Sequence, residues 1–111
     1  MALKINWKKM DGVQGREGVT RKIFSGKNCM MALIEAKPIA KPLPHHHPHE
    51  QITCILQGTG EFTLGEEKID LVEGDVILVP PNVPHSFKVT SIGPVVELTV
   101  FSPIREDYLP T

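Results

Sequence analysis

The fold is decided by the stretch His45-His46-His47-Pro48-His49-Glu50-Gln51-Ile52-Thr53-Cys54-Ile55-Leu56-Gln57-Gly58, which begins with four imidazoles in five residues and continues into an apolar, β-branched segment. Neutral imidazole is the commonest protein ligand for divalent transition metals. Side chains two residues apart on a strand share a face, so His45 and His47 can reach one ion while His46 points the other way. Pro48 ends that strand, and Gln51, at the start of the next, can turn back toward the same ion.

The composition of the whole chain indicates a single globular domain. The chain has 111 residues, of which 41% are apolar and 23% charged, with a formal net charge of −1. This length suits one apolar core, and the absence of a basic cluster argues against nucleic acid as a partner. Residues 1–10 lack the apolar run of a signal peptide, and no segment reaches transmembrane length. We therefore expect a cytoplasmic protein with no membrane association.

The two cysteines form neither a CxxC pair nor a disulfide framework. Cys29 and Cys54 each lie in an apolar, strand-like segment, and we expect both to be buried thiols in a reducing compartment.

Short β-branched and apolar runs, separated by Gly and Pro, predict an all-β fold. No stretch keeps a helical period for ten residues, and eight or nine short strands at this spacing are typical of an antiparallel sandwich or barrel. We expect loops or sharp turns at Gly12, Gly15 and Gly18, and a Pro-rich connection over 37–44. The predicted strands are 19–24, 30–36, 51–56, 61–64, 68–71, 76–79, 85–90 and 95–101.

The strand from Gln51 to Leu56 is mostly apolar on both faces. An antiparallel strand with one face in water alternates more cleanly between apolar and polar residues. The outer face of its sheet is therefore expected to be covered, most simply by a second subunit of a homodimer.

A second motif is arranged like the first, and the two together resemble the motifs of a known family. In Gly74-x5-Pro80-x-Asn82-x2-His85, a turn, a strand and a Pro-braced loop place one imidazole at the start of another strand. With His45-x-His47-x3-Gln51-x6-Gly58, this resembles the two motifs of the cupins, with Gln in place of the usual Glu. The resemblance implies one cupin domain over 1–111, a jelly-roll barrel (double-stranded β-helix) of antiparallel strands. Its core would span about 30–101, with the N-terminal strands and the C-terminal tail packing on it.

The same resemblance implies a metal site and a set of ligands. Carried across by position, the ligands are His45, His47, Gln51 and His85, whereas His46 and His49 match no ligand position. The alternative for Gln51 is an ordinary strand residue.

The C-terminal segment from Val100 to Leu109 resembles a narrower group, the pectin-degradation cupins, as do Thr20-Arg21-Lys22-Ile23 and the His-Pro-His-Glu-Gln run. These proteins convert ring-opened 4,5-unsaturated monouronates into linear keturonates at a metal site of three His and one Gln. Phe101 and Arg105 match residues near that family's active site, and Thr99 lies where the family has an Asp. Phe101 could instead be a core residue, and Arg105 a surface residue paired with Glu106 or Asp107.

A set of four neutral ligands also has a chemical consequence that does not depend on the family resemblance. Without a carboxylate among them, an ion keeps its full 2+ charge, which favours binding of an organic anion and Lewis-acid chemistry over redox chemistry. We expect one divalent ion (Ni, Zn, Mn, Fe or Co) and a small sugar acid or organic acid as ligand. Arg105 would hold the anionic end of the substrate, with Phe101 and Thr99 beside it. Thr99 is a poor base, so Glu97, on the same strand face, is the candidate general base.

Two other functions fit the same residues. One is a non-catalytic sugar-binding or sensor cupin, which the loss of the Asp at Thr99 would suit. The other is a metal-dependent dioxygenase, against which the neutral fourth ligand counts.

Overall fold

The computed structural model describes residues 3–109 and consists of two antiparallel sheets. Among these residues the only helical segments are two short 3-10 turns, and no helix is long and apolar enough to cross a membrane. In chain order the elements are η1 (Trp7–Lys9), β1 (Val13–Arg16), β2 (Val19–Ser25), β3 (Met30–Ala36), β4 (Glu50–Gln57), β5 (Gly60–Leu64), β6 (Glu67–Leu71), β7 (Val76–Val79), β8 (His85–Val89), β9 (Val95–Ser102) and η2 (Glu106–Tyr108).

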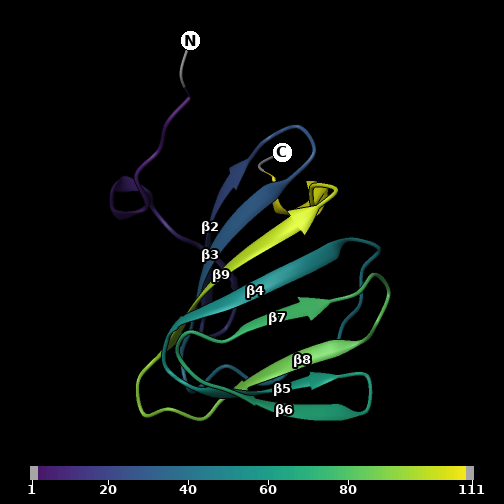
Figure 1. Cartoon of the computed structure of the whole chain (residues 1–111). Coiled ribbons are helices and arrows are strands. Elements are labelled where there is room, and N and C mark those ends of the chain that lie inside the picture. The colour runs from purple at the N-terminus through teal and green to yellow at the C-terminus, as the bar shows by residue number, and fades with distance from the viewer. Residues whose placement is uncertain (1–2, 110–111) are drawn as a thin grey trace.

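The larger sheet has the strand order β1-β2-β3-β9-β4-β7, and the smaller one has the order β6-β5-β8. Figure 1 shows the larger sheet above the smaller one, with the tail after β9 folding back beside β2 and β3. The crossover that puts β9 between β3 and β4 joins the two ends of the chain in one sheet. The all-β fold predicted from the sequence is confirmed.

One predicted loop is a strand. Val13–Arg16 forms β1 and pairs with β2, with a register irregularity between Gln14 and Arg16. The turn between the strands contains Gly18 with φ of 79°, a left-handed conformation that glycine adopts without strain. The glycines around β1 therefore belong to a hairpin whose first strand is a sheet edge, where Gly is tolerated.

The core has two parts. One lies between the sheets, where Ile55, Val79 and Val95 of the larger sheet meet Phe62, Leu71 and Val89. The other surrounds Met30, Ala32 and Phe101, and Ile104, Tyr108 and Leu109 of the tail pack against it. The tail therefore closes the end of the larger sheet that the smaller sheet leaves uncovered.

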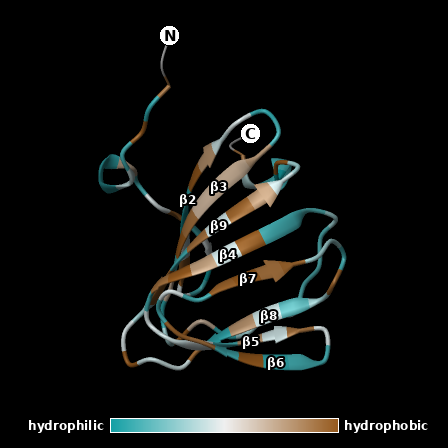
Figure 2. Ribbon diagram, in the orientation of Figure 1, coloured by the Kyte–Doolittle hydropathy of each residue, from teal (hydrophilic) through white to brown (hydrophobic). Residues whose placement is uncertain are grey.

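The outward face of β4 and β7 is apolar and exposed. Ile52 is opposite Leu78, and Cys54 is opposite Val76, on neighbouring strands. Ile52, Val76 and Leu78 are 44%, 62% and 52% exposed. Figure 2 shows the hydrophobic colour along β7 and over parts of β4 and β9. The predicted second subunit on this face stays a prediction.

The cysteine expectation is wrong for Cys29. This residue is exposed because it lies in the turn between Ser25 and Met30 rather than in a strand, and Cys54 is only partly buried.

Candidate metal centre and its cavity

Three imidazoles converge at the mouth of the barrel. His45 and His85 form an isolated β-bridge, in which each backbone N–H donates to the other's carbonyl at 3.0 and 2.9 Å. His47 follows two residues later, just before Pro48 turns the chain into β4. One ring nitrogen from each of the three lies within 4.8 Å of the others, and His47 and His85 are buried. Two distant motifs thus bring three imidazoles to one point.

The backbone sets the tautomer of each ring. Every Nδ1 faces a backbone carbonyl two residues away in the chain, at 2.8 Å for His45, 3.1 Å for His47 and 2.9 Å for His85. With Nδ1 donating its proton to a carbonyl, Nε2 of His45 and of His85 has a free lone pair, as a metal ligand requires. Nε2 of His47 faces the side-chain oxygen of Gln51. Nε2 of His85 is buried and has no hydrogen-bond partner within the described part of the chain. Such an atom is costly unless it binds something.

Burial keeps the rings of His47 and His85 neutral. Burial, followed by the charge of Arg105, lowers the pKa of His47. Burial lowers the pKa of His85 to about 4, against a smaller opposing effect of the hydrogen bond to Val83. Both rings are therefore unprotonated at neutral pH, the form that binds a metal ion.

Gln51 lies beside one of the three imidazoles. Its Oε1 lies 3.0 Å from Nε2 of His47, and its Nε2 donates to Oγ1 of Thr53 at 2.9 Å. Two ligands that are each about 2.1 Å from one ion lie about 3 Å apart when they are roughly at right angles. The three imidazoles could hold one divalent ion, and the place of Gln51 as a fourth ligand stays a prediction.

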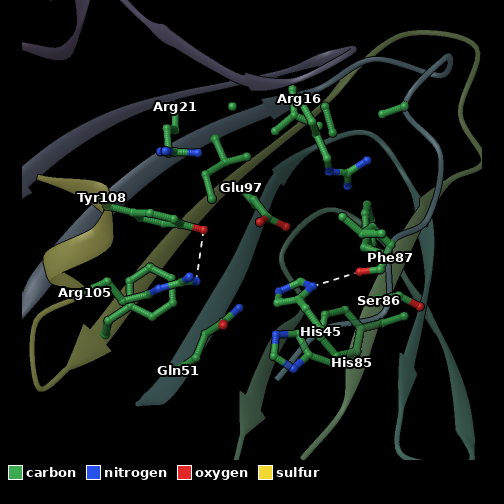
Figure 3. A pocket seen from close by; sticks show the side chains of 18 of the residues that line it. Arg16, Arg21, His45, Gln51, His85, Ser86, Phe87, Glu97, Arg105 and Tyr108 are labelled. Carbon is green, nitrogen blue, oxygen red and sulfur yellow. Dashed lines mark hydrogen bonds between the residues drawn. The ribbon is translucent and has the colours of Figure 1, made fainter. Parts of the chain in front are cut away.

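His45 and His85 border a cavity of about 390 Å³ between the two sheets. This size is in the range of small-molecule sites. Figure 3 shows His45, His85 and Gln51 on one side of it and Arg21, Tyr108 and Arg105 across from them, with Glu97 in between. The further lining residues include Arg16, Ile34, Leu43, His46, Phe62, Phe87 and Phe101.

Glu97 is the acidic side chain in this cavity wall. It lies on the inward face of β9, opposite Ile34 of β3 and Ile55 of β4. Burial raises the pKa of Glu97 to about 7, and a hydrogen bond with Thr99 opposes the rise. The side chain is partly accessible from the cavity, so water there moderates the effect of burial. A carboxyl group with this pKa can both accept and donate a proton at neutral pH.

The fold and these donors point to one family. The sequence pattern of the family Cupin domain (Cupin_2) matches residues 32–101, which run from within β3 to within β9. The chain is a cupin. An uncharacterized protein of Methanocaldococcus jannaschii, MJ1618, is 37% identical to it over 84 residues, or 75% of this chain and 66% of that protein. The present chain thus spans just under two thirds of the length of MJ1618.

Solved structures agree on the fold. KdgF from Halomonas sp. superposes with a TM-score of 0.89 and 28% identity, covering 98% of this cupin and all of that chain. An RmlC-like cupin from Shewanella frigidimarina has a TM-score of 0.86 and 24% identity, covering 95% and 94% of the two chains. The second likeness concerns the fold alone.

The other predicted site residues of this cupin lie as follows. Phe101 is buried and lies edge-on to His47 at 5.7 Å, so it is both a core residue and part of the cavity wall. Thr99 is fully buried, and its hydroxyl is 2.9 Å from that of Thr53, behind the residues that line the cavity. A run of polar groups therefore links Gln51 through Thr53 and Thr99 to Glu97.

Arg105 lines the cavity but already has an anionic partner. Its Nη2 and Nε donate to the carboxylate of Asp107 at 2.7 and 3.3 Å, and its Nη1 donates to the hydroxyl of Tyr108 at 3.0 Å. The ion pair with Asp107 is the alternative that the sequence left open, and it coexists with a place in the cavity wall.

Sequence reasoning assigned no role to Arg16, Arg21, His46 or Tyr108, all of which border the cavity. Arg21 and Tyr108 were visible only as parts of the resemblance to pectin-degradation cupins. Nothing local in the sequence indicates that they meet, because β2 and the tail come together only through the larger sheet.

Proposed function

We propose that this cupin is a metal-dependent enzyme that converts a small unsaturated sugar acid, a 4,5-unsaturated uronate, into its linear keto form. The observation that carries the proposal is a cluster of three imidazoles, two of which line the same cavity as the buried carboxyl group of Glu97. The 28% identity to KdgF over nearly the whole chain supports it, as does the C-terminal resemblance to the pectin-degradation cupins.

The reaction needs proton transfer and no redox step. When an enol becomes a ketone, one O–H bond breaks and one C–H bond forms, so the proton count is unchanged. A bound divalent ion supplies Lewis-acid polarisation of the substrate oxygens. Glu97, with a pKa raised to about 7, accepts the proton and returns it at carbon. The positively charged wall of the cavity faces the anionic end of the substrate.

The test follows loss of the unsaturated uronate by NMR with metal-loaded protein. We expect turnover by the wild type and loss of most turnover in Glu97→Gln, with metal content unchanged. Glu35→Gln, an exposed change on the neighbouring strand β3, is the matched control. Turnover by Glu97→Gln at the wild-type rate would remove Glu97 from the mechanism, and an inactive wild type would refute the proposed reaction.

A non-catalytic sugar-acid-binding cupin is the second candidate, and one observation favours it. Thr99 replaces the Asp of the pectin-degradation cupins, and its hydroxyl is buried against Thr53. If Thr99→Asp gains turnover while the wild type only binds the uronate, the binding module is the better description. The dioxygenase alternative is less favoured because four neutral donors stabilise a trivalent ion poorly.

A further inference from the structure

Tyr108 lies between two guanidinium groups at the wall of the cavity (Figure 3). Arg21 of β2 and Arg105 each place the guanidinium carbon 4.0 Å from the centre of the Tyr108 ring. Stacking on an aromatic face suits the planar guanidinium group and restricts its motion. The two arginines are thus held in similar ways by one ring.

Their charges are balanced differently. Arg105 shares both oxygens of Asp107, and that hydrogen bonding is the main reason for the lowered pKa of Asp107, which stays ionised at neutral pH. Its positive charge is therefore largely neutralised before any ligand arrives. The Arg21 side chain forms no hydrogen bond and no ion pair with any residue in the range 3–109. Its charge and its N–H donors are available to a ligand.

The position of Arg21 is also prepared by β1. A Cβ atom at Gly15 would overlap Nη1 of Arg21, so the glycine leaves the space that the guanidinium group occupies. Gly15 and Arg21 both line the cavity. A guanidinium group that is already fixed by a ring and a backbone loses less entropy when it binds an anion.

We propose that Arg21, together with the hydroxyl of Tyr108, binds the carboxylate of the ligand, and that Arg105 is a positioning residue for Tyr108. The hydroxyl oxygen of Tyr108 accepts a hydrogen bond from Arg105, which leaves its own O–H free to donate toward the cavity. This inference rests on the proposed function in taking the ligand to be a small sugar acid. In this arrangement the carboxylate of the ligand binds Arg21 and Tyr108, and the other oxygens of the ligand face the metal site.

The test measures binding of D-galacturonate, a stable sugar carboxylate, to nickel-loaded protein by calorimetry, with D-galactose as the uncharged comparison. We expect wild-type protein to bind the acid more tightly than the neutral sugar. Arg21→Gln should weaken binding of the acid about thirtyfold or more, as loss of one partner of a desolvated charge pair does. Arg21→Lys should recover part of this, because it keeps the charge but loses the planar, two-pronged geometry. Lys88→Gln removes an exposed charge outside the cavity and should have no effect.

Gly15→Ala supplies a second, independent variant, since it displaces the guanidinium group without removing its charge. We expect weaker binding of D-galacturonate with unchanged nickel content, whereas Gly93→Ala, which meets no atom within 4 Å, should behave as wild type. The proposal is overturned if Arg21→Gln binds the acid as well as wild type, if Arg105→Gln weakens binding more than Arg21→Gln does, or if wild type binds no D-galacturonate. Absence of turnover with intact, Arg21-dependent binding would refute the proposed reaction and leave this inference standing.

Discussion

Replacement of Glu97 by Gln should make the protein more stable at high pH while removing the proposed base. Burial raises the pKa of Glu97 from an ordinary value of 4.5 to about 7. In the unfolded chain the group ionises near the ordinary value, so between these two pH values the folded state binds more protons than the unfolded state. The stability associated with this group is therefore present below pH 4.5 and is lost as the pH rises through 7. The whole loss corresponds to at most about 3 kcal/mol, less whatever water in the cavity screens.

The measurement is urea unfolding of chelator-treated protein at pH 5, 6, 7 and 8, followed by circular dichroism. The difference in unfolding free energy between Glu97→Gln and wild type should be small at pH 5 and should grow with pH up to about 8. The lowered pKa values of His47 and His85 make both proteins less stable as the pH falls below about 6.5, and this effect cancels in the difference. Glu35→Gln, which removes an exposed carboxyl group on the adjacent strand, is measured in parallel as the matched control.

A flat difference for Glu97→Gln across this range would show that the carboxyl group has an ordinary pKa in the folded protein. The reasoning that makes Glu97 a base matched to neutral pH would then be wrong, whatever the activity of the variant.

Three further predictions follow from the metal centre and the sheet surfaces. His47→Ala and His85→Ala should each lose the divalent ion in metal analysis of untagged protein, and wild-type metal content in both variants would exclude the proposed centre. The exposed apolar face around Ile52 and Leu78 should pair two copies of the chain. Sedimentation at micromolar concentration should therefore show a dimer for the wild type and a monomer for Leu78→Lys. A monomeric wild type would contradict this prediction. Gly60→Ala should destabilise the protein by about 1–3 kcal/mol in urea unfolding, because its Cβ would overlap the Phe87 ring and the Lys88 carbonyl. A loss below about 0.5 kcal/mol, the scale of a neutral surface change, would contradict this prediction.

The sequence predicted the fold well where local pattern and final structure depend on the same residues. The strand Met30–Ala36 has the bounds expected of it, because its apolar run is bounded by turn residues at one end and by Pro38 near the other. Prediction failed where pairing overrides propensity. Val13–Arg16 contains a central glycine and reads as a loop, but its hydrogen bonds to β2 make it a strand.

The residues of the candidate site also fall into those that local sequence pattern predicts and those that depend on the tertiary fold. His45, His47 and His85 were predictable because each belongs to a motif whose spacing is visible in the sequence. Arg21 and Tyr108 belong to segments far apart in the chain, and their contact depends on how the tail packs on the larger sheet. No periodicity in the sequence encodes such a contact.

The hydrogen bonds from the three imidazoles to backbone carbonyls have a consequence for metal exchange. Because the carbonyls of Leu43, His49 and Val83 orient the rings, the chain assembles its donors on folding and does not depend on an ion to bring them together. A site of this kind can release one ion and take up another without unfolding, unlike small domains that fold only around their metal. An ion bound there would then follow the supply of divalent ions in its surroundings, and protein from cells grown on different metals would carry different ions in the same scaffold.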